Sequence, residues 1–163
     1  MDALKLLRQQ HREVDQLFER FEAAGANARE AKEQLCRKVN DALAVHAAIE
    51  ERLFYPATQD ARTEELLHEA VEEHLAARRL AAGLLEAGLD DAQLDARMKA
   101  LQEQVRHHVT EEEGELFPVV RKMLDVDDLE QLGEQMETMA NELKQAGEPR
   151  REGPGQVEDA AGI

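Results

Sequence analysis

Two segments of the chain contain the same order of chemically active residues. In HAAIEERLFYP, which begins at His46, and in HVTEEEGELFP, which begins at His108, a glutamate follows the histidine after four residues and a proline after ten. On a helix of about 3.6 residues per turn, residues four apart lie only about 40° away from each other around the axis. An imidazole nitrogen and a carboxylate oxygen on one helix face can bind the same metal ion.

One further histidine precedes each of these segments at nearly the same distance. His11 lies 35 residues before His46, and His74 lies 34 residues before His108. The chain is therefore an approximate duplication of a helix with one histidine followed by a helix with His-x-x-x-Glu. Two such helix pairs, packed about a pseudo-twofold axis, would bring all these side chains to one level of the core. The predicted metal ligands are His11, His46, Glu50, His74, His108 and Glu112.

This donor set fits two metal ions bridged by carboxylates. A single histidine on an apolar helix face is usually a hydrogen-bonded core residue, and a single His-x-x-x-Glu is usually a surface pair. The combination on four successive helices has no such simple structural explanation, because buried carboxylates are costly without a positive charge between them. Mixed nitrogen and oxygen donors suit iron or manganese better than a metal that prefers thiolates.

The other histidines and the acidic neighbours of the predicted ligands are expected to face solvent. His68 lies about 240° around the helix from His74, and His107 lies about 100° away from the next residue, so both should point outward. Glu51 and Glu113, which directly follow the predicted carboxylate ligands, should likewise lie on the surface.

Apolar residues spaced three and four apart predict the helices that position these ligands. Gly25, Pro56 and Gly88 mark three helix ends, and Thr63 is a candidate N-cap. We predict an all-α fold: an antiparallel four-helix bundle followed by a short fifth helix that crosses or extends it. The apolar stripes run over residues 4–21, 35–53, 67–84, 94–112 and 129–143.

The composition agrees with one helical domain. The chain has 163 residues, of which 42% are hydrophobic and only 3% aromatic, a mixture poor in strand-forming residues. This length is enough to bury a real core. We expect the domain to span residues 1–146. Residues 147–163 are rich in Gly, Pro and charge, and we expect them to form a disordered tail.

Charge excludes some classes of partner. The chain carries 20 basic and 36 acidic residues, a net charge of −16, which repels nucleic acid and anionic lipid. No apolar run is long enough to span a membrane, and the charged N-terminus differs from a signal peptide, so we expect a cytoplasmic protein. Cys36 is the single cysteine and is expected to be a buried free thiol.

The six predicted ligands, together with LFYP and ELFP at the ends of their helices, resemble the hemerythrin-like, or HHE cation-binding, domain. The resemblance covers roughly residues 4–124. It implies a left-handed four-helix bundle around a non-haem di-iron centre with an oxo or hydroxo bridge, in which Glu50 and Glu112 bridge the two irons. His11 and His46 would serve one iron, with His74 and His108 at the other, although the pairing of histidines to metals cannot be read from the sequence.

The sequence departs from the oxygen-carrying members of that family. Their third helix supplies two histidines four residues apart, whereas Ala70 and Arg78 flank His74 at that spacing. The four-His, two-Glu pattern is similar to the branch that includes nitric-oxide-linked iron-centre repair proteins and mycobacterial proteins with catalase-type activity. We therefore expect a protein that acts on peroxide, oxygen or nitric oxide, with catalase-like removal of hydrogen peroxide favoured. The alternative is a protein that senses or binds oxygen or nitric oxide, or that senses iron status, without turnover, and any redox or signalling partner is unknown.

Tyr55 is the only tyrosine, and Phe117 occupies the equivalent position of the second repeat. Straight helix geometry places it about 180° from His46, with its hydroxyl in water. The following residue, Pro56, removes a helix hydrogen bond and could instead turn the phenol inward. Two interpretations are therefore open: a packed surface tyrosine, or a phenolate ligand in one of the open iron positions.

Overall fold

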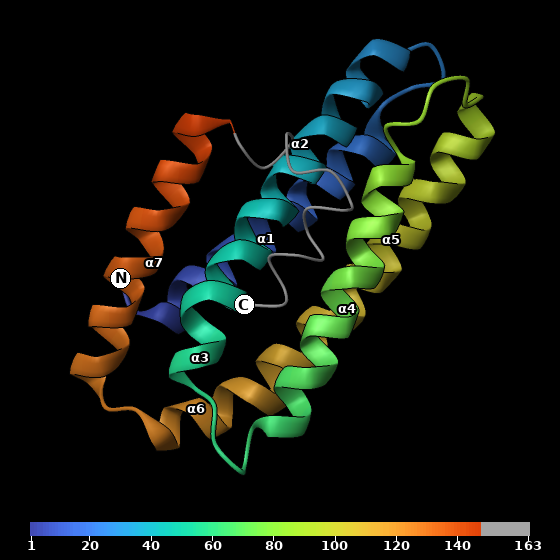
Figure 1. The fold of residues 1–163 in the computed structure, drawn as a ribbon. Coiled ribbons are helices and arrows are strands. Elements are labelled where there is room, and N and C mark those ends of the chain that lie inside the picture. The colour runs from blue at the N-terminus through green and yellow to red at the C-terminus, as the bar shows by residue number, and fades with distance from the viewer. Residues whose placement is uncertain (148–163) are drawn as a thin grey trace.

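The computed structural model describes residues 1–147 of the chain, and the predicted tail from residue 148 onward lies outside the described residues. Four long helices form an antiparallel bundle (Figure 1). They are α1 (Ala3–Ala23), α2 (Arg29–Ile49), α4 (Glu64–Gly83) and α5 (Asp91–Glu111). Residues 1–147 contain no strand, so the predicted all-α class is confirmed.

The second and fourth helices of the bundle do not end at the predicted ligands but widen there. Each passes through a five-residue π-helix and continues as a short α-helix. These segments are η1 (Glu50–Phe54) with α3 (Tyr55–Ala57), and η2 (Glu112–Leu116) with α6 (Phe117–Met123). Such wider turns place one extra residue in the helix and occur frequently at functional sites.

Acidic side chains begin three of the helices. Asp2 accepts a hydrogen bond from the Lys5 amide at the start of α1. Asp90 and Asp125 each form a capping box, at the start of α5 and of the last helix, α7 (Val126–Ala146). Thr63 occupies the predicted N-cap position of α4, but its hydroxyl donates to the Thr58 carbonyl at 2.6 Å instead of capping the helix.

The hydrophobic core is divided into two clusters along the bundle. One cluster, which includes Phe18 and Leu101, fills the end of the bundle near the α1–α2 turn. The other, which includes Phe54 and Phe117, fills the end beside α7. The predicted ligands are buried although they are polar. Burying this polar layer costs free energy, which interactions within the layer must offset.

The fifth long helix, α7 (Val126–Ala146), packs outside the bundle against α1 and α2 (Figure 1). It has 21 residues, the same as α1, so the expectation of a short helix was wrong. Gly133 is where α7 meets the N-terminus: a Cβ there would lie against the Met1 carbonyl oxygen and 2.8 Å from the Ala3 amide nitrogen. This close backbone approach allows α7 to cover the apolar face of α1.

Gly133→Ala should therefore destabilise the protein, although alanine favours helices. The added methyl group meets backbone rather than a flexible side chain, so we expect a loss of about 1–3 kcal/mol in the free energy of unfolding. Denaturant unfolding measures it. The control Gln135→Ala, on the exposed side of the same helix, should change stability by less than about 0.5 kcal/mol. Equal stabilities of the two variants would contradict the close packing at Gly133.

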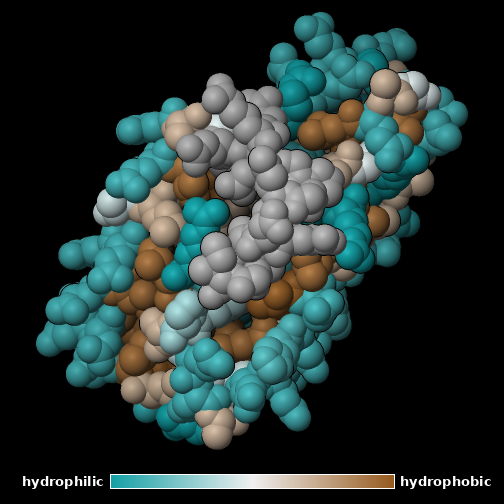
Figure 2. Space-filling model, viewed as in Figure 1, coloured by the Kyte–Doolittle hydropathy of each residue, from teal (hydrophilic) through white to brown (hydrophobic). Residues whose placement is uncertain are grey.

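The surface is predominantly polar. Figure 2 shows charged and polar side chains along the outer sides of the helices and apolar side chains in the grooves between them. Among the described residues, no helix is both long and apolar enough to cross a membrane.

Candidate metal centre

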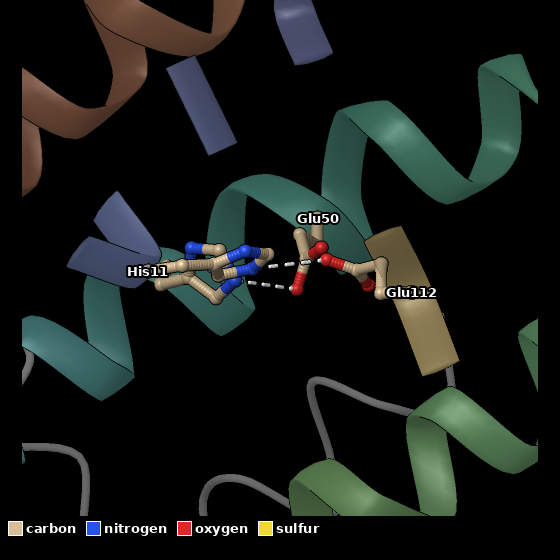
Figure 3. Close-up of side chains that lie close together, drawn as sticks. His11, Glu50 and Glu112 are labelled. Carbon is tan, nitrogen blue, oxygen red and sulfur yellow. Dashed lines mark ion pairs between the residues drawn. The ribbon is translucent and has the colours of Figure 1, made fainter. Parts of the chain in front are cut away.

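The structure brings all six predicted ligands together in one buried layer. They come from six different segments, α1, α2, η1, α4, α5 and η2, and each residue is at most 7% exposed. Figure 3 shows the imidazole of His11 facing the carboxylates of Glu50 and Glu112, which belong to different helices. The duplicated spacing in the sequence therefore corresponds to a shared site in space.

Glu50 lies at the middle of this layer. Its Oε1 is 3.0 Å from Nε2 of His46 and 3.0 Å from Nε2 of His74. The same oxygen is 3.8 Å from Nε2 of His108. Glu50 is fully buried. A buried carboxylate surrounded by imidazole nitrogens is a candidate metal ligand.

Glu112 occupies the equivalent position in the second repeat. Its Oε1 is 3.2 Å from Nε2 of His11, and its Oε2 is 3.3 Å from Nε2 of His108. The candidate donor atoms form two groups, in each of which all atoms lie within 4.8 Å of one another. The groups, which share Glu50, are His11, His46, Glu50 and Glu112, and Glu50, His74 and His108. The layer thus contains two neighbouring groups of candidate metal donors.

Several of these donor atoms make no hydrogen bond of good geometry, although other polar atoms of the layer lie 3.0–3.8 Å away. The unpaired buried atoms include Nε2 of His11, His46 and His108, Oε2 of Glu50 and Oε1 of Glu112. A buried polar atom without a partner costs about 1–3 kcal/mol. Cations between these atoms would satisfy them together, so the residues present fit a metal centre.

The opposite nitrogen of each imidazole faces an outer polar residue. Nδ1 of His46 donates to Oε1 of Gln10 at 2.7 Å, and Nδ1 of His11 donates to Glu113 at 2.8 Å. Nδ1 of His108 donates to Glu73 at 2.9 Å. A proton held on Nδ1 leaves the lone pair of Nε2 directed at the centre. These outer partners therefore orient the candidate ligands.

Glu51 supports His74 in the same way, but less closely. One of its oxygens lies 3.4 Å from Nδ1 of His74 and also forms an ion pair with Arg78. The expectation that Glu51 and Glu113 are plain surface residues was therefore wrong. Their side chains are 12% and 32% exposed, respectively, and each points toward the histidine of a neighbouring helix.

The sequence contained a signal for these outer partners that our interpretation did not use. Glu51 and Glu113 each follow a predicted carboxylate ligand, and Gln10 and Glu73 each precede a single histidine. The duplication therefore extends to the residues beside the ligands. The directions of the Glu51 and Glu113 side chains could not be assigned from regular helix angles alone. Both residues lie in the π-helices, where the angle per residue differs from that of an α-helix.

Tyr55 points into the centre. Only 5% of the residue is exposed, and its hydroxyl donates to Oε2 of Glu112 at 2.8 Å and lies 3.3 Å from Nε2 of His74. Its ring stacks on His74 with centroids 5.6 Å apart, as the ring of Phe117 stacks on His11 at 6.2 Å. The interpretation that left the hydroxyl in water was wrong.

The π-helix explains this inward orientation. The Tyr55 amide donates to the Glu50 carbonyl, five residues back, rather than to the residue four back. One residue is thus absorbed by the wider turn, so Tyr55 lies effectively about eight α-helical steps from His46, or about 80°, rather than 180°. The helix widens before Pro56 and does not unwind.

Buried carboxylates and imidazoles shift one another's protonation. Burial alone would raise the pKa of Glu50, but His46 and the other neighbours hold it well below the usual value. Burial would lower the pKa of His108, but Glu112 and other carboxylates raise it well above the usual value. Burial, followed by the charge of Glu112, raises the pKa of Tyr55 well above that of a free phenol. Tyr55 therefore remains protonated unless a cation lies close to its oxygen.

A small cavity adjoins the histidines on the apolar side of the layer. Its volume is about 40 Å³, and its apolar walls come from all four bundle helices. A water molecule needs roughly 10–15 Å³ on the same scale, so the cavity has room for only a few atoms. The lining residues include Val14, Leu43, Ala47, Ala77, Val105 and Val109.

Other sequence expectations were also met. His68 and His107 are exposed, as the helix angles predicted. Cys36 is a buried free thiol, and burial raises its pKa to about 11, so it is not activated as a nucleophile.

Comparison with known proteins agrees with this site. The family model of the hemerythrin HHE cation-binding domain matches residues 2–120. A crystal structure of a hemerythrin HHE cation-binding domain-containing protein from Mycobacterium kansasii has a similar fold, with a TM-score of 0.80 and 22% sequence identity. The match covers 98% of this chain and 99% of that one. A search of curated proteins found no match.

Proposed function

Because the chain belongs to the hemerythrin HHE cation-binding family, we propose that its His/Glu layer holds two iron ions and acts on hydrogen peroxide, oxygen or nitric oxide. Catalase-like removal of hydrogen peroxide is the favoured activity. The observation that carries the proposal is the pair of donor groups that share Glu50, with buried nitrogen and oxygen atoms left unpaired by the protein.

The number of donors favours reaction with small ligands. Two octahedral ions offer about twelve positions, of which two bridging carboxylates, four imidazoles and one oxo or hydroxo bridge fill about ten. About two positions are left for exogenous ligands or for Tyr55. An iron pair supplies a centre that can exchange two electrons with peroxide or oxygen.

The protein's own residues determine which molecules reach this centre and how it is held. The cavity of about 40 Å³ beside the histidines has room for a ligand of only a few atoms. Gln10, Glu51, Glu73 and Glu113 hold protons on the Nδ1 side of the imidazoles. The negative charges of Glu51, Glu73 and Glu113 also favour higher metal oxidation states, because they increase the basicity of the imidazole ligands.

We also propose that Tyr55 is a ligand of the loaded centre. Its hydroxyl oxygen already lies among candidate donors, beside Glu112 and His74. In the metal-free protein the Tyr55 hydroxyl donates to Glu112. A cation nearby would lower the pKa of the phenol, so that its proton would pass to solvent while Glu112 stays ionised as a ligand. The phenolate would then occupy a position that a second histidine of the third helix fills in oxygen-carrying relatives.

Metal analysis and peroxide turnover test the proposed function together. Protein expressed with ample iron should contain about two irons per chain and should release oxygen from hydrogen peroxide over many turnovers, whereas His74→Ala should not. Reproducibly absent iron, or zinc alone, would contradict the di-iron assignment. Activity no higher than that of free iron in the same buffer would exclude catalase-like turnover.

The same experiment separates the enzyme from the alternative. A sensing or binding protein would bind oxygen or nitric oxide stoichiometrically, with a spectral change and no sustained turnover. Both outcomes require the iron pair. The metal content therefore tests whether a di-iron centre forms, and the turnover tests whether that centre is catalytic.

A further inference from the structure

A second group of metal-binding residue types lies on the surface beside the buried centre. Nε2 of His107 is 3.2 Å from Oε2 of Glu73 and 3.2 Å from Oε1 of Glu111. His107 and Glu111 are one helical turn apart on α5, and Glu73 reaches them from α4. Their candidate donor atoms all lie within 4.8 Å of one another. The His107 side chain is 62% exposed, so solutes can reach the group from solvent.

The other half of the duplicated chain lacks this group. Aligning the repeats on their predicted ligands places Gln10 opposite Glu73, Val45 opposite His107 and Ile49 opposite Glu111. Val45 and Ile49 are buried in the core cluster that includes residues of α7. Where the first repeat has a packing surface for α7, the second repeat therefore has the exposed imidazole of His107 beside two partly buried carboxylates. The side chains of Glu73 and Glu111 are 14% and 31% exposed, respectively.

Glu73 belongs to both the surface group and the support of the buried centre. Its Oε1 accepts from Nδ1 of His108 at 2.9 Å, while its Oε2 faces His107. The two oxygens of Glu73 thus contact different histidines. A cation bound to Oε2 would therefore leave the hydrogen bond to His108 in place.

The local charge favours a cation at this position. Two carboxylates converge here, and a positive charge between them relieves their mutual repulsion. A divalent ion would supply twice the charge of a protonated imidazole and would also use the Nε2 lone pair of His107. The protein as a whole carries a net charge of −16, which raises the concentration of cations at its surface.

We propose that Glu73, His107 and Glu111 form a second, solvent-exposed site for a divalent transition-metal ion, linked to the buried centre through the carboxylate of Glu73. One imidazole and two carboxylates suit zinc, ferrous iron or manganese and leave the remaining positions to water. This site does not depend on which reaction the buried centre performs.

Zinc binding to the metal-loaded protein tests the proposal. Equilibrium dialysis against micromolar to millimolar Zn²⁺, followed by elemental analysis, should find one zinc per chain beyond the ions of the buried centre. His107→Ala and Glu111→Gln should each weaken this zinc binding at least about tenfold. His68→Ala, which removes another exposed histidine from α4, should leave it unchanged.

Two further measurements separate this site from the buried centre. The tightly bound metal content and the visible spectrum of His107→Ala should equal those of the unmodified protein, because His107 does not face the centre. Glu73→Gln should both weaken the surface zinc and change the spectrum of the centre through His108. Zinc binding equal in His107→Ala and in the unmodified protein would overturn the proposal, as would no additional zinc at millimolar concentration.

Discussion

Glu50→Ala is expected to lose most of the bound iron. Glu50 contributes to both donor groups, and Glu112 reaches His11 of one group and His108 of the other, so Glu112→Ala should lose most of the iron as well. Loss of bound metal should also lower the midpoint temperature of thermal unfolding. An ion that binds only the folded state stabilises it by about 2.7 kcal/mol when the free ion concentration is about 100 times its dissociation constant. Elemental analysis and thermal unfolding, with and without added iron, measure both effects.

Variants of neighbouring glutamates show whether the effect is specific. Glu115→Ala, at an exposed position of the same π-helix as Glu112, should retain its iron. Glu51→Gln and Glu113→Gln should weaken metal binding by roughly 10–100-fold, because they support histidines without contributing to the donor groups. Full iron content in Glu50→Ala would disprove the assignment of this carboxylate as a bridge, and complete loss in Glu115→Ala would indicate general unfolding instead.

Tyr55→Phe is expected to abolish a visible absorption band of the oxidised protein while the iron content stays the same. A phenolate bound to ferric iron absorbs visible light by charge transfer, and phenylalanine cannot supply this ligand. The substitution should fold normally, since Phe117 occupies the equivalent position of the other repeat and stacks on His11 as Tyr55 stacks on His74. An ultraviolet–visible spectrum and an iron determination on the same sample make the measurement.

The outcome separates the two roles that the geometry allows for the phenol. A band lost at constant iron supports ligation. An identical spectrum in Tyr55→Phe would restrict Tyr55 to its hydrogen bond with Glu112, and a parallel loss of iron would assign it to holding that carboxylate in place.

The sequence alone determined the helices and the inward-facing ligands. Apolar residues spaced three and four apart form one face of each helix, and the histidines lie on that same face. These faces are buried together only if the four helices pack around a common interior. The repetition of His-x-x-x-Glu placed His46 with Glu50, and His108 with Glu112, at matching depths. All these residues lie in the buried layer where the pattern put them. Local periodicity was sufficient because α1, α2, α4 and α5 are regular up to the ligands.

Only the tertiary structure decided how the residues just beyond Glu50 and Glu112 are oriented. The two π-helices shift the following residues by one position around the axis, which turned Tyr55 inward although a regular helix would have pointed it away. Glu51 and Glu113 support histidines on other helices, and Glu73 connects two candidate sites through separate oxygens. A wider turn depends on packing and on the backbone bond that the following proline cannot make, and contacts between helices depend on their relative placement. Neither is contained in the angular spacing of residues along a single helix.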